Sequence, residues 1–230
     1  VFGKRDIREG VRINGAHIDS PRLDLKPNPL YETEELAYFK THYYGGIKKY
    51  QWTTIPLALH GRIMLADGKA IDVDFGEKPG DPVLVITDLL PHLGRAQGER
   101  KLNEGIKGEE LNILLGSLPV DDKEVKEAFK LRVLSILHDK YGITEKDFMR
   151  SELTLVPAQK AVDVGLDSSM VGAYGQDDKV CAYTALMAEL ECKTPEFTSL
   201  TALVDKEEIG STGNTGMQSD ALLHFVEDLA

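Results

Sequence analysis

Three groups of polar residues have the types and spacings that metal-dependent chemistry requires. His17 and Asp19 are two positions apart, so in an extended chain both side chains lie on one face. Gln176-Asp177-Asp178 and Asp205-Lys206-Glu207-Glu208 follow later in the chain. Histidine nitrogens and carboxylate oxygens are suitable ligands for Zn²⁺, Co²⁺ or Mn²⁺, and a two-metal site needs a bridging carboxylate. Together the three groups predict a dinuclear metal site.

Each group by itself also has a structural interpretation. A histidine near a strand end is more often a hydrogen-bonded structural residue than a ligand, and Asp177-Asp178 suits a helix N-cap. The run 205–208 also fits a solvated loop. After a buried strand, however, adjacent carboxylates repel each other unless a cation binds there or one carboxyl keeps its proton. The acidic pair then divides the work, because one glutamate holds metal while the other accepts a proton from water.

Each group is expected at the end of a strand or at the start of a helix. Residues 11–18 predict a strand that stops before Ser20-Pro21, because proline cannot join an interior ladder. The apolar run 197–204 predicts a buried strand ahead of the acidic run. A helix is expected from Asp177-Asp178 onward. Its apolar stripe consists of Val180, Tyr183, Leu186, Met187 and Leu190. Open α/β sheets place their sites at such strand ends.

The middle of the chain has the pattern of antiparallel β structure. Large apolar residues alternate over 55–65, and Asp67-Gly68 is a hairpin signal before the alternation of 71–75. Further short strands are expected at 82–87, 111–115 and 153–156. One helix interrupts them, with apolar residues recurring over 125–137 and Gly142 as its stop. A last helix is expected after Ser219-Asp220.

These elements predict an α/β protein of two domains. Residues 1–23 and 159–230 are expected to form an α/β domain, which is incomplete in this chain. Residues 24–158 are expected to form an inserted β-rich domain. The last helix has no stop signal, so the chain ends are expected to be cut.

The composition is that of an acidic globular protein. Of 230 residues, 27 are basic and 38 acidic, a formal charge of −11 with no basic stripe, so nucleic-acid binding is not expected. Apolar runs are too short to span a bilayer. Cys181 and Cys192 share a predicted helix and lie roughly 16 Å apart, too far for a disulfide. Val1-Phe2-Gly3 is followed by charged residues and not by an apolar stretch, so a secretory leader is not expected. A cytoplasmic location is expected.

Three ordered motifs resemble those of the M18 aminopeptidases, a family of dinuclear zinc peptidases. The motifs are Gly15–Leu23, Gly175–Asp178 and Asp205–Ser211. Tyr44–Ile47 and the stretch 86–93 resemble the inserted domain of the same family. The resemblance extends over nearly the whole chain. It implies an α/β catalytic domain of the zinc-peptidase type, interrupted by an inserted β-rich dimerisation domain, and it implies the activity.

The resemblance also implies a role for each matching residue. His17 and Glu208 would bind metal, and Asp177 would bridge two metal ions. Glu207 would be the general base, and Asp19 would support the site from the second shell.

Three positions depart from the family pattern. The family uses a further Asp and a further His well downstream of the acidic pair, and His224 comes too early to be that histidine, so three of five ligands are expected here. Asp178 occupies a position that usually has an amide side chain. In aspartate-preferring relatives a histidine of the inserted domain reaches a neighbouring active site, and Asp88 occupies what corresponds to that position, which weakens the case for acidic substrates.

The predicted function is therefore a metal-dependent aminopeptidase with two Zn²⁺ per active site, or Co²⁺ or Mn²⁺ in their place. Two alternatives stay open: a related dinuclear amidohydrolase or deacylase, and a non-catalytic assembly protein on the same scaffold. The expected partners are peptide substrates and further copies of the chain, in a dimer or a larger assembly joined through residues 24–158. Neither nucleic acid nor membrane is an expected partner.

Overall fold

A computed structural model describes all residues 1–230 and divides into two compact units. One consists of Val1–Pro21 with Val162–Ala230, and the other of Arg22–Ala161. The strands are β1 (Val11–His17), β2 (Arg22–Thr33), β3 (Leu36–Tyr44), β4 (Leu57–Met64), β5 (Ala70–Phe75), β6 (Ile113–Gly116), β7 (Ser151–Pro157), β8 (Val162–Val164), β9 (Met170–Gly172) and β10 (Thr198–Val204). The α-helices are α1 (Arg95–Gly98), α2 (Ala128–Tyr141), α3 (Gln176–Glu191) and α4 (Ala221–Leu229). None of them is long and apolar enough to cross a membrane.

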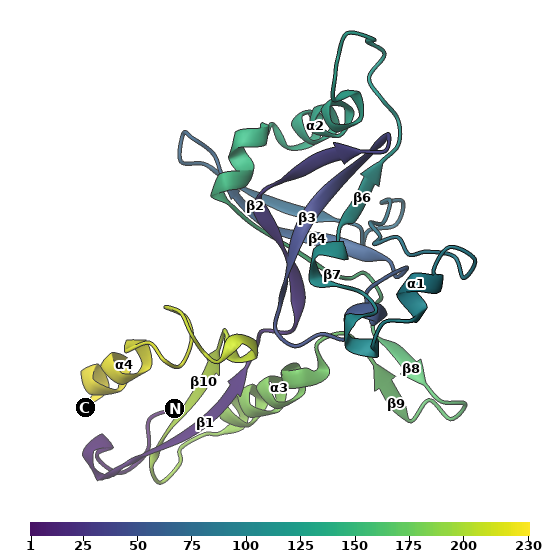
Figure 1. The fold of residues 1–230 in the computed structure, drawn as a ribbon. Coiled ribbons are helices and arrows are strands. Elements are labelled where there is room, and N and C mark those ends of the chain that lie inside the picture. Colours follow the sequence, from purple (N-terminus) through teal and green to yellow (C-terminus); the bar gives the residue numbers. More distant parts are fainter. The chain divides into compact units, whose positions relative to one another are not determined.

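The discontinuous unit is built on a parallel pair of strands. β1 pairs with β10 from Val11 opposite Thr198 to His17 opposite Val204. The N–H of Ile18 extends the ladder by donating to the carbonyl of Val204 over 2.8 Å. α3 packs along both strands (Figure 1). Because the strands are parallel, their carboxyl ends lie at the same edge, so the segments that follow His17 and Val204 start side by side.

The start of α3 depends on a glycine. Gly175 has φ +78, a left-handed conformation that favours glycine. A Cβ atom there would lie 2.5 Å from Nζ of Lys179 and 3.0 Å from Oγ of Ser20. Asp177 and Asp178 follow with non-helical dihedral angles, so the regular helix begins after them.

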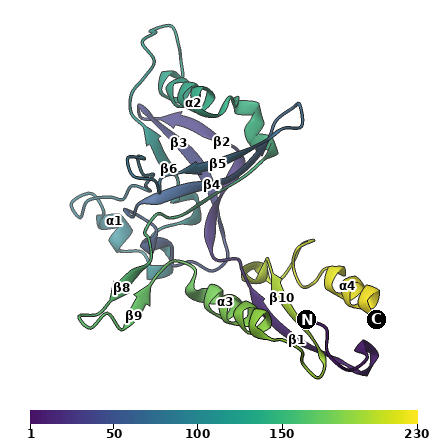
Figure 2. The same cartoon turned by 180° about the vertical axis from the view of Figure 1, so that it is seen from behind.

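The inserted unit is an antiparallel sheet in the order β5-β4-β7-β2-β3-β6. Its largest fully buried side chains are Leu23, Pro29, Phe39, Leu57, Ile63, Ile113 and Leu155 of the strands, with Ile86, Leu111 and Ile143 from the connecting segments. α2 packs on β2, β3 and β6, as the view from behind shows (Figure 2). Its first turn is capped from β2, because one carboxylate oxygen of Glu32 accepts the N–H groups of Phe129 and Lys130 at 2.9 Å.

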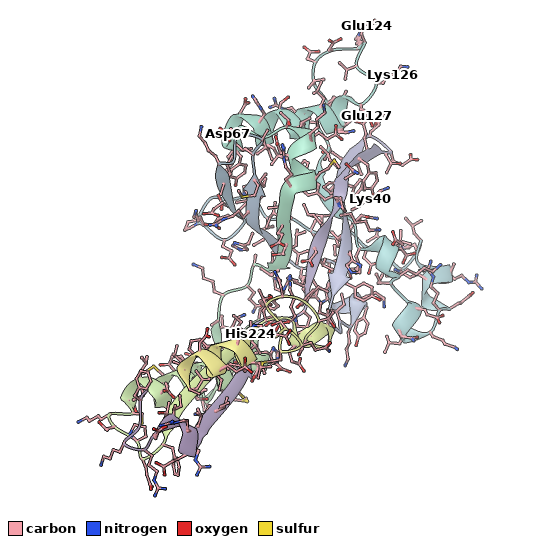
Figure 3. The ribbon with its side chains drawn as sticks, turned by 90° about the vertical axis from the view of Figure 1, so that its left-hand side faces the viewer. Lys40, Asp67, Glu124, Lys126, Glu127 and His224 are labelled. Atoms are coloured by element: carbon pink, nitrogen blue, oxygen red, sulfur yellow. The ribbon has the colours of Figure 1, made fainter.

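The sequence predicted the hairpin and the helix of this unit well. β4 and β5 pair around the Asp67-Gly68 turn, and α2 ends at Gly142, which has φ +70. Figure 3 labels Asp67 at this turn and Glu127, the residue before α2. The prediction for 82–87 was wrong, because this segment forms only single bridges, from Leu84 to Leu57 and from Val85 to Leu114.

Three features were not predicted from the sequence. β2 contains Pro27 and Pro29, which argue against a strand, and its register with β3 shifts between Leu25 and Leu30. β3 was also not predicted. The short hairpin of β8 and β9 forms a separate two-stranded sheet just before α3.

Gly61 is a sensitive point of the sheet. It lies within β4 at φ +141, and a Cβ atom there would be 1.9 Å from the carbonyl oxygen of Glu152 in β7. We expect Gly61→Ala to reduce the free energy of unfolding by about 3 kcal/mol, because β4 and β7 must separate locally. Gly46→Ala, where a Cβ meets nothing within 4 Å, is the matched control and should change it little. Denaturant unfolding of both variants tests this; equal stabilities would contradict it.

Candidate metal centre

His17 is the last residue of β1, and its imidazole faces acidic groups on both sides. Nδ1 lies 3.0 Å from the main-chain oxygen of Asp19 and 3.3 Å from its Oδ1. Nε2 lies 3.2 Å from Oδ1 of Asp177 and 3.8 Å from Oε2 of Glu207. When Nδ1 carries the proton and donates it toward Asp19, Nε2 is the nitrogen that can bind a metal.

Asp19 connects the two strand ends of the unit. Its carboxylate is buried, with Oδ1 accepting the N–H of Glu207 and Oδ2 accepting the N–H of Glu208, each over 3.2 Å. These bonds and the neighbouring imidazole offset the cost of burying a charge. One carboxylate thus fixes the ring of His17 and the backbone of both glutamates. The expectation that Asp19 supports the site is consistent with this geometry.

Asp177 and Asp178 reach the same place from the start of α3. Oγ of Ser20 donates to the main-chain oxygen of Asp177 over 3.2 Å, and Oδ2 of Asp178 accepts the main-chain N–H of His17 over 3.3 Å. The N-cap residue of α3 is Gly175, and the cap has no side-chain hydrogen bond, so the N-cap interpretation of this pair is not borne out. Oδ1 of Asp177 instead lies 3.2 Å from Nε2 of His17.

Glu207 and Glu208 do not continue the extended strand β10, which ends at Val204. Lys206 has φ +72, and Glu207–Ile209 form one turn of 3₁₀ helix that ends at Gly210 with φ +77. Strand alternation therefore cannot assign their directions. The turn is closed by the N–H of Ser211, which donates to the carbonyl of Lys206 over 2.7 Å.

The concentration of charge shifts the pKa values of this group. Burial raises the pKa of Glu208, and the charges of Asp177 and Glu207 raise it further. Burial lowers the pKa of His17, but the hydrogen bond with Asp177 and the bond and charge of Asp19 outweigh it, so that the pKa is raised. Neighbouring carboxylates contribute to both shifts, and a divalent cation would offset their negative charge.

The structure thus brings together all five residues singled out in the sequence. His17, Asp19, Asp177, Glu207 and Glu208 converge from β1, the start of α3 and the turn after β10. His224 lies on α4 (Figure 3) and has no contact with them among its hydrogen bonds or ion pairs. The sequence alone did not indicate the bonds of Ser20 and Asp178. The one indication in the sequence was that Ser20 directly follows Asp19 and Asp178 directly follows Asp177, so both are neighbours of candidate site residues.

A histidine at the end of a parallel strand, with carboxylates converging from a helix start and a neighbouring turn, is the kind of site that α/β metallohydrolases use. The whole chain, residues 1–230, matches the family described as aminopeptidase I zinc metalloprotease (M18). The chain therefore belongs to the M18 aminopeptidase family.

The relatives support this membership over nearly the full chain. A probable M18 family aminopeptidase 1 of Clostridium acetobutylicum is 54% identical over 229 residues, which are 100% of this chain and 49% of the relative. The crystal structure of an M18 aminopeptidase from Thermotoga maritima superposes with a TM-score of 0.93 at 51% identity, covering 97% of this chain and 49% of that one. A crystal structure of aminopeptidase I from Clostridium acetobutylicum superposes with a TM-score of 0.93 at 51% identity, covering 100% of this chain and 50% of that one. The chain thus spans about half the length of these relatives.

His17 should make the stability of the metal-free protein depend on pH. Its pKa is raised in the folded state, so protonation stabilises the fold at pH values below the ordinary histidine pKa, about 6.5. This contribution is lost as the pH rises through the raised pKa. We expect His17→Gln to destabilise the metal-free protein more at pH 5.5 than at pH 8.5, in denaturant unfolding with a chelator present. A larger effect at pH 8.5 would contradict the geometry around the ring.

Proposed function

We propose that the protein is a zinc-dependent aminopeptidase that removes single residues from the N-terminus of peptides. The convergence of His17, Asp177 and Glu208 at one sheet edge carries this proposal, together with the family membership. The activity belongs to the whole protein, of which this chain represents about half by comparison with its relatives.

The residues present fit a zinc centre. The donor set is one imidazole and several carboxylates, which suits Zn²⁺, and burial together with the charges of Asp177 and Glu207 raises the pKa of Glu208. We propose that His17, Asp177 and Glu208 hold metal, with Asp177 between two ions. When bound, zinc polarises a carbonyl group and lowers the pKa of water.

Glu207 is the proposed proton carrier. Its carboxylate is more than half exposed and lies 3.8 Å from Nε2 of His17, so it reaches the solvent side of the cluster. In this role it accepts a proton from the attacking water and delivers it to the departing amine. Asp19 keeps Glu207 in place through the backbone N–H, and it keeps the imidazole oriented.

The inserted unit is proposed to carry contacts between copies of the protein, in a dimer or a larger assembly. β5 and β6 are the two edge strands of its sheet, and edge strands can pair with another chain. The segment between them in the chain has three exposed apolar side chains, Leu89, Leu90 and Leu93. Asp88 is committed to its own loop, because its Oδ1 accepts from the N–H of Leu89 and from Nε2 of Gln97. We therefore do not assign a preference for acidic substrates.

The substrate test separates this proposal from its alternatives. We expect the full-length, zinc-loaded protein to hydrolyse aminoacyl chromogenic amides and to leave N-acylated ones intact, because an aminopeptidase requires a free α-amino group. Hydrolysis of only the N-acylated compounds would indicate a deacylase. No hydrolysis of either class would indicate the non-catalytic alternative. A chelator should abolish activity, and Zn²⁺ should restore it.

A second test assigns the two glutamates. Glu207→Gln keeps the shape and removes the proton acceptor, so turnover should fall by roughly two to four orders of magnitude, whereas the zinc content stays near that of the unaltered protein. Glu208→Gln should lower zinc affinity, and added zinc should partly restore activity. Turnover with metal analysis of both variants distinguishes the roles. The opposite pattern reverses the assignment, and full activity in both rejects it.

A further inference from the structure

A second group of metal-ligating side chains lies in the inserted unit, on the β4–β5 hairpin. His60 of β4 is directly opposite Asp74 of β5, and Nδ1 of the ring is 3.7 Å from Oδ1 of the carboxylate. Glu77 follows β5, and its Oε1 is 3.5 Å from Nε2 of the same ring. One ligand atom from each residue lies within 4.8 Å of the others. The three side chains are 33%, 44% and 42% exposed, so an ion from solution can reach them.

The backbone fixes where Glu77 lies. Gly76 directly precedes it with φ +105, and a Cβ atom there would be 3.0 Å from Cα of Ala58. Oδ2 of Asp81 accepts the N–H of Gly76 over 3.1 Å and the N–H of Lys78 over 3.3 Å. The turn that presents Glu77 is therefore pinned to the hairpin, and the cross-strand pair fixes the other two residues.

A lysine now neutralises part of this group. Nζ of Lys78 is 2.7 Å from Oδ2 of Asp74, and its side chain is 65% exposed. Oδ1 of Asp74 stays on the side of the imidazole. With Lys78 counted and His60 neutral, the group retains one negative charge. A divalent cation is attracted to such a group, and the mobile ammonium group of Lys78 is its competitor.

We propose that His60, Asp74 and Glu77 form a binding site for a transition-metal dication, with Zn²⁺ as the probe ion. An imidazole ligand favours Zn²⁺, Co²⁺, Ni²⁺ or Cu²⁺ over Mg²⁺ or Ca²⁺. Zinc bonds of about 2.0–2.2 Å place neighbouring ligand atoms about 3.3–3.6 Å apart. In the structure Nε2 of His60 and Oε1 of Glu77 are 3.5 Å apart, Oδ1 of Asp74 lies 3.7 Å from the other ring nitrogen, Nδ1, and one ligand atom of each residue lies within 4.8 Å of the others. The ion takes one ring nitrogen, small rotations bring in the carboxylates, and water completes the coordination.

Binding here would join β4, the edge strand β5 and the turn that follows it. A ligand that binds only the folded state raises the temperature of unfolding, so the site has a readout independent of catalysis. The site shares no residue with the centre at His17. Its existence therefore does not depend on whether the protein hydrolyses peptides.

The test compares variants of the full-length protein by equilibrium dialysis and calorimetric titration with Zn²⁺. His60→Gln removes the nitrogen ligand and should lower the affinity for one of the bound zinc ions by about tenfold or more. Lys78→Met removes the competing cation and should raise the affinity for the same zinc ion several-fold. His92→Gln alters an exposed histidine in the same unit and is the matched control that should leave zinc binding unchanged.

The zinc-dependent rise in unfolding temperature should follow the same order, with Lys78→Met above the unaltered protein and His60→Gln below it. Equal zinc binding in His60→Gln and His92→Gln would overturn the site, as would unchanged or weaker binding in Lys78→Met. If His60→Gln disturbs the sheet, Glu77→Gln replaces it as the deciding variant, because residue 77 lies outside the strands. It should weaken the same zinc equivalent, and unchanged binding would overturn the site.

Discussion

The candidate centre depends on one buried carboxylate that joins two distant segments. Asp19 accepts the N–H groups of Glu207 and Glu208, which are 188 and 189 positions away, and it also faces the ring of His17. Two of these groups are backbone N–H donors, and Nδ1 of His17 is a third donor when it carries the proton, so an ionised carboxylate satisfies them together. Without it, two backbone N–H groups would lose their partners at the place where the proposed base and ligand must be held. An asparagine has one oxygen and would turn an amide group toward one of these donors.

The sequence predicted which residues would lie close together better than it predicted their detailed geometry. Residue types and order sufficed to single out His17, Asp177 and the acidic pair, because strand ends in a parallel sheet lie at one edge. The turn conformation of Glu207–Ile209 was not foreseen, since the left-handed Lys206 that starts it is a non-glycine residue. The bond from Ser20 to the main chain of Asp177 depends on a contact across the unit, which no local pattern encodes.

The same division holds for the fold. The β4–β5 hairpin and α2 carry strong local signals, namely alternation around Asp67-Gly68 and a glycine stop, and the structure has both. β2 was missed because its two prolines oppose strand formation locally. Pro27 and Pro29 lie between Leu25 and Leu30, where the register with β3 shifts, so neither residue has to donate to the ladder. The paired parts of β2 lie on either side of them, and Pro29 is fully buried.

The parallel pairing of β1 with β10 also constrains the order of folding. A ribosome releases β1 early, but its partner strand emerges only after the whole inserted unit has been made. The strands of the inserted sheet are joined by shorter loops. The pair of β1 and β10 forms only after β10 has been made, and its formation closes a very long loop, which costs more conformational entropy. A folded insert shortens that loop, because its two ends are then held by one compact body. Formation of the candidate centre should therefore be among the last steps of folding, and substitutions that slow the insert, such as Gly61→Ala, should delay it although they lie in the other unit.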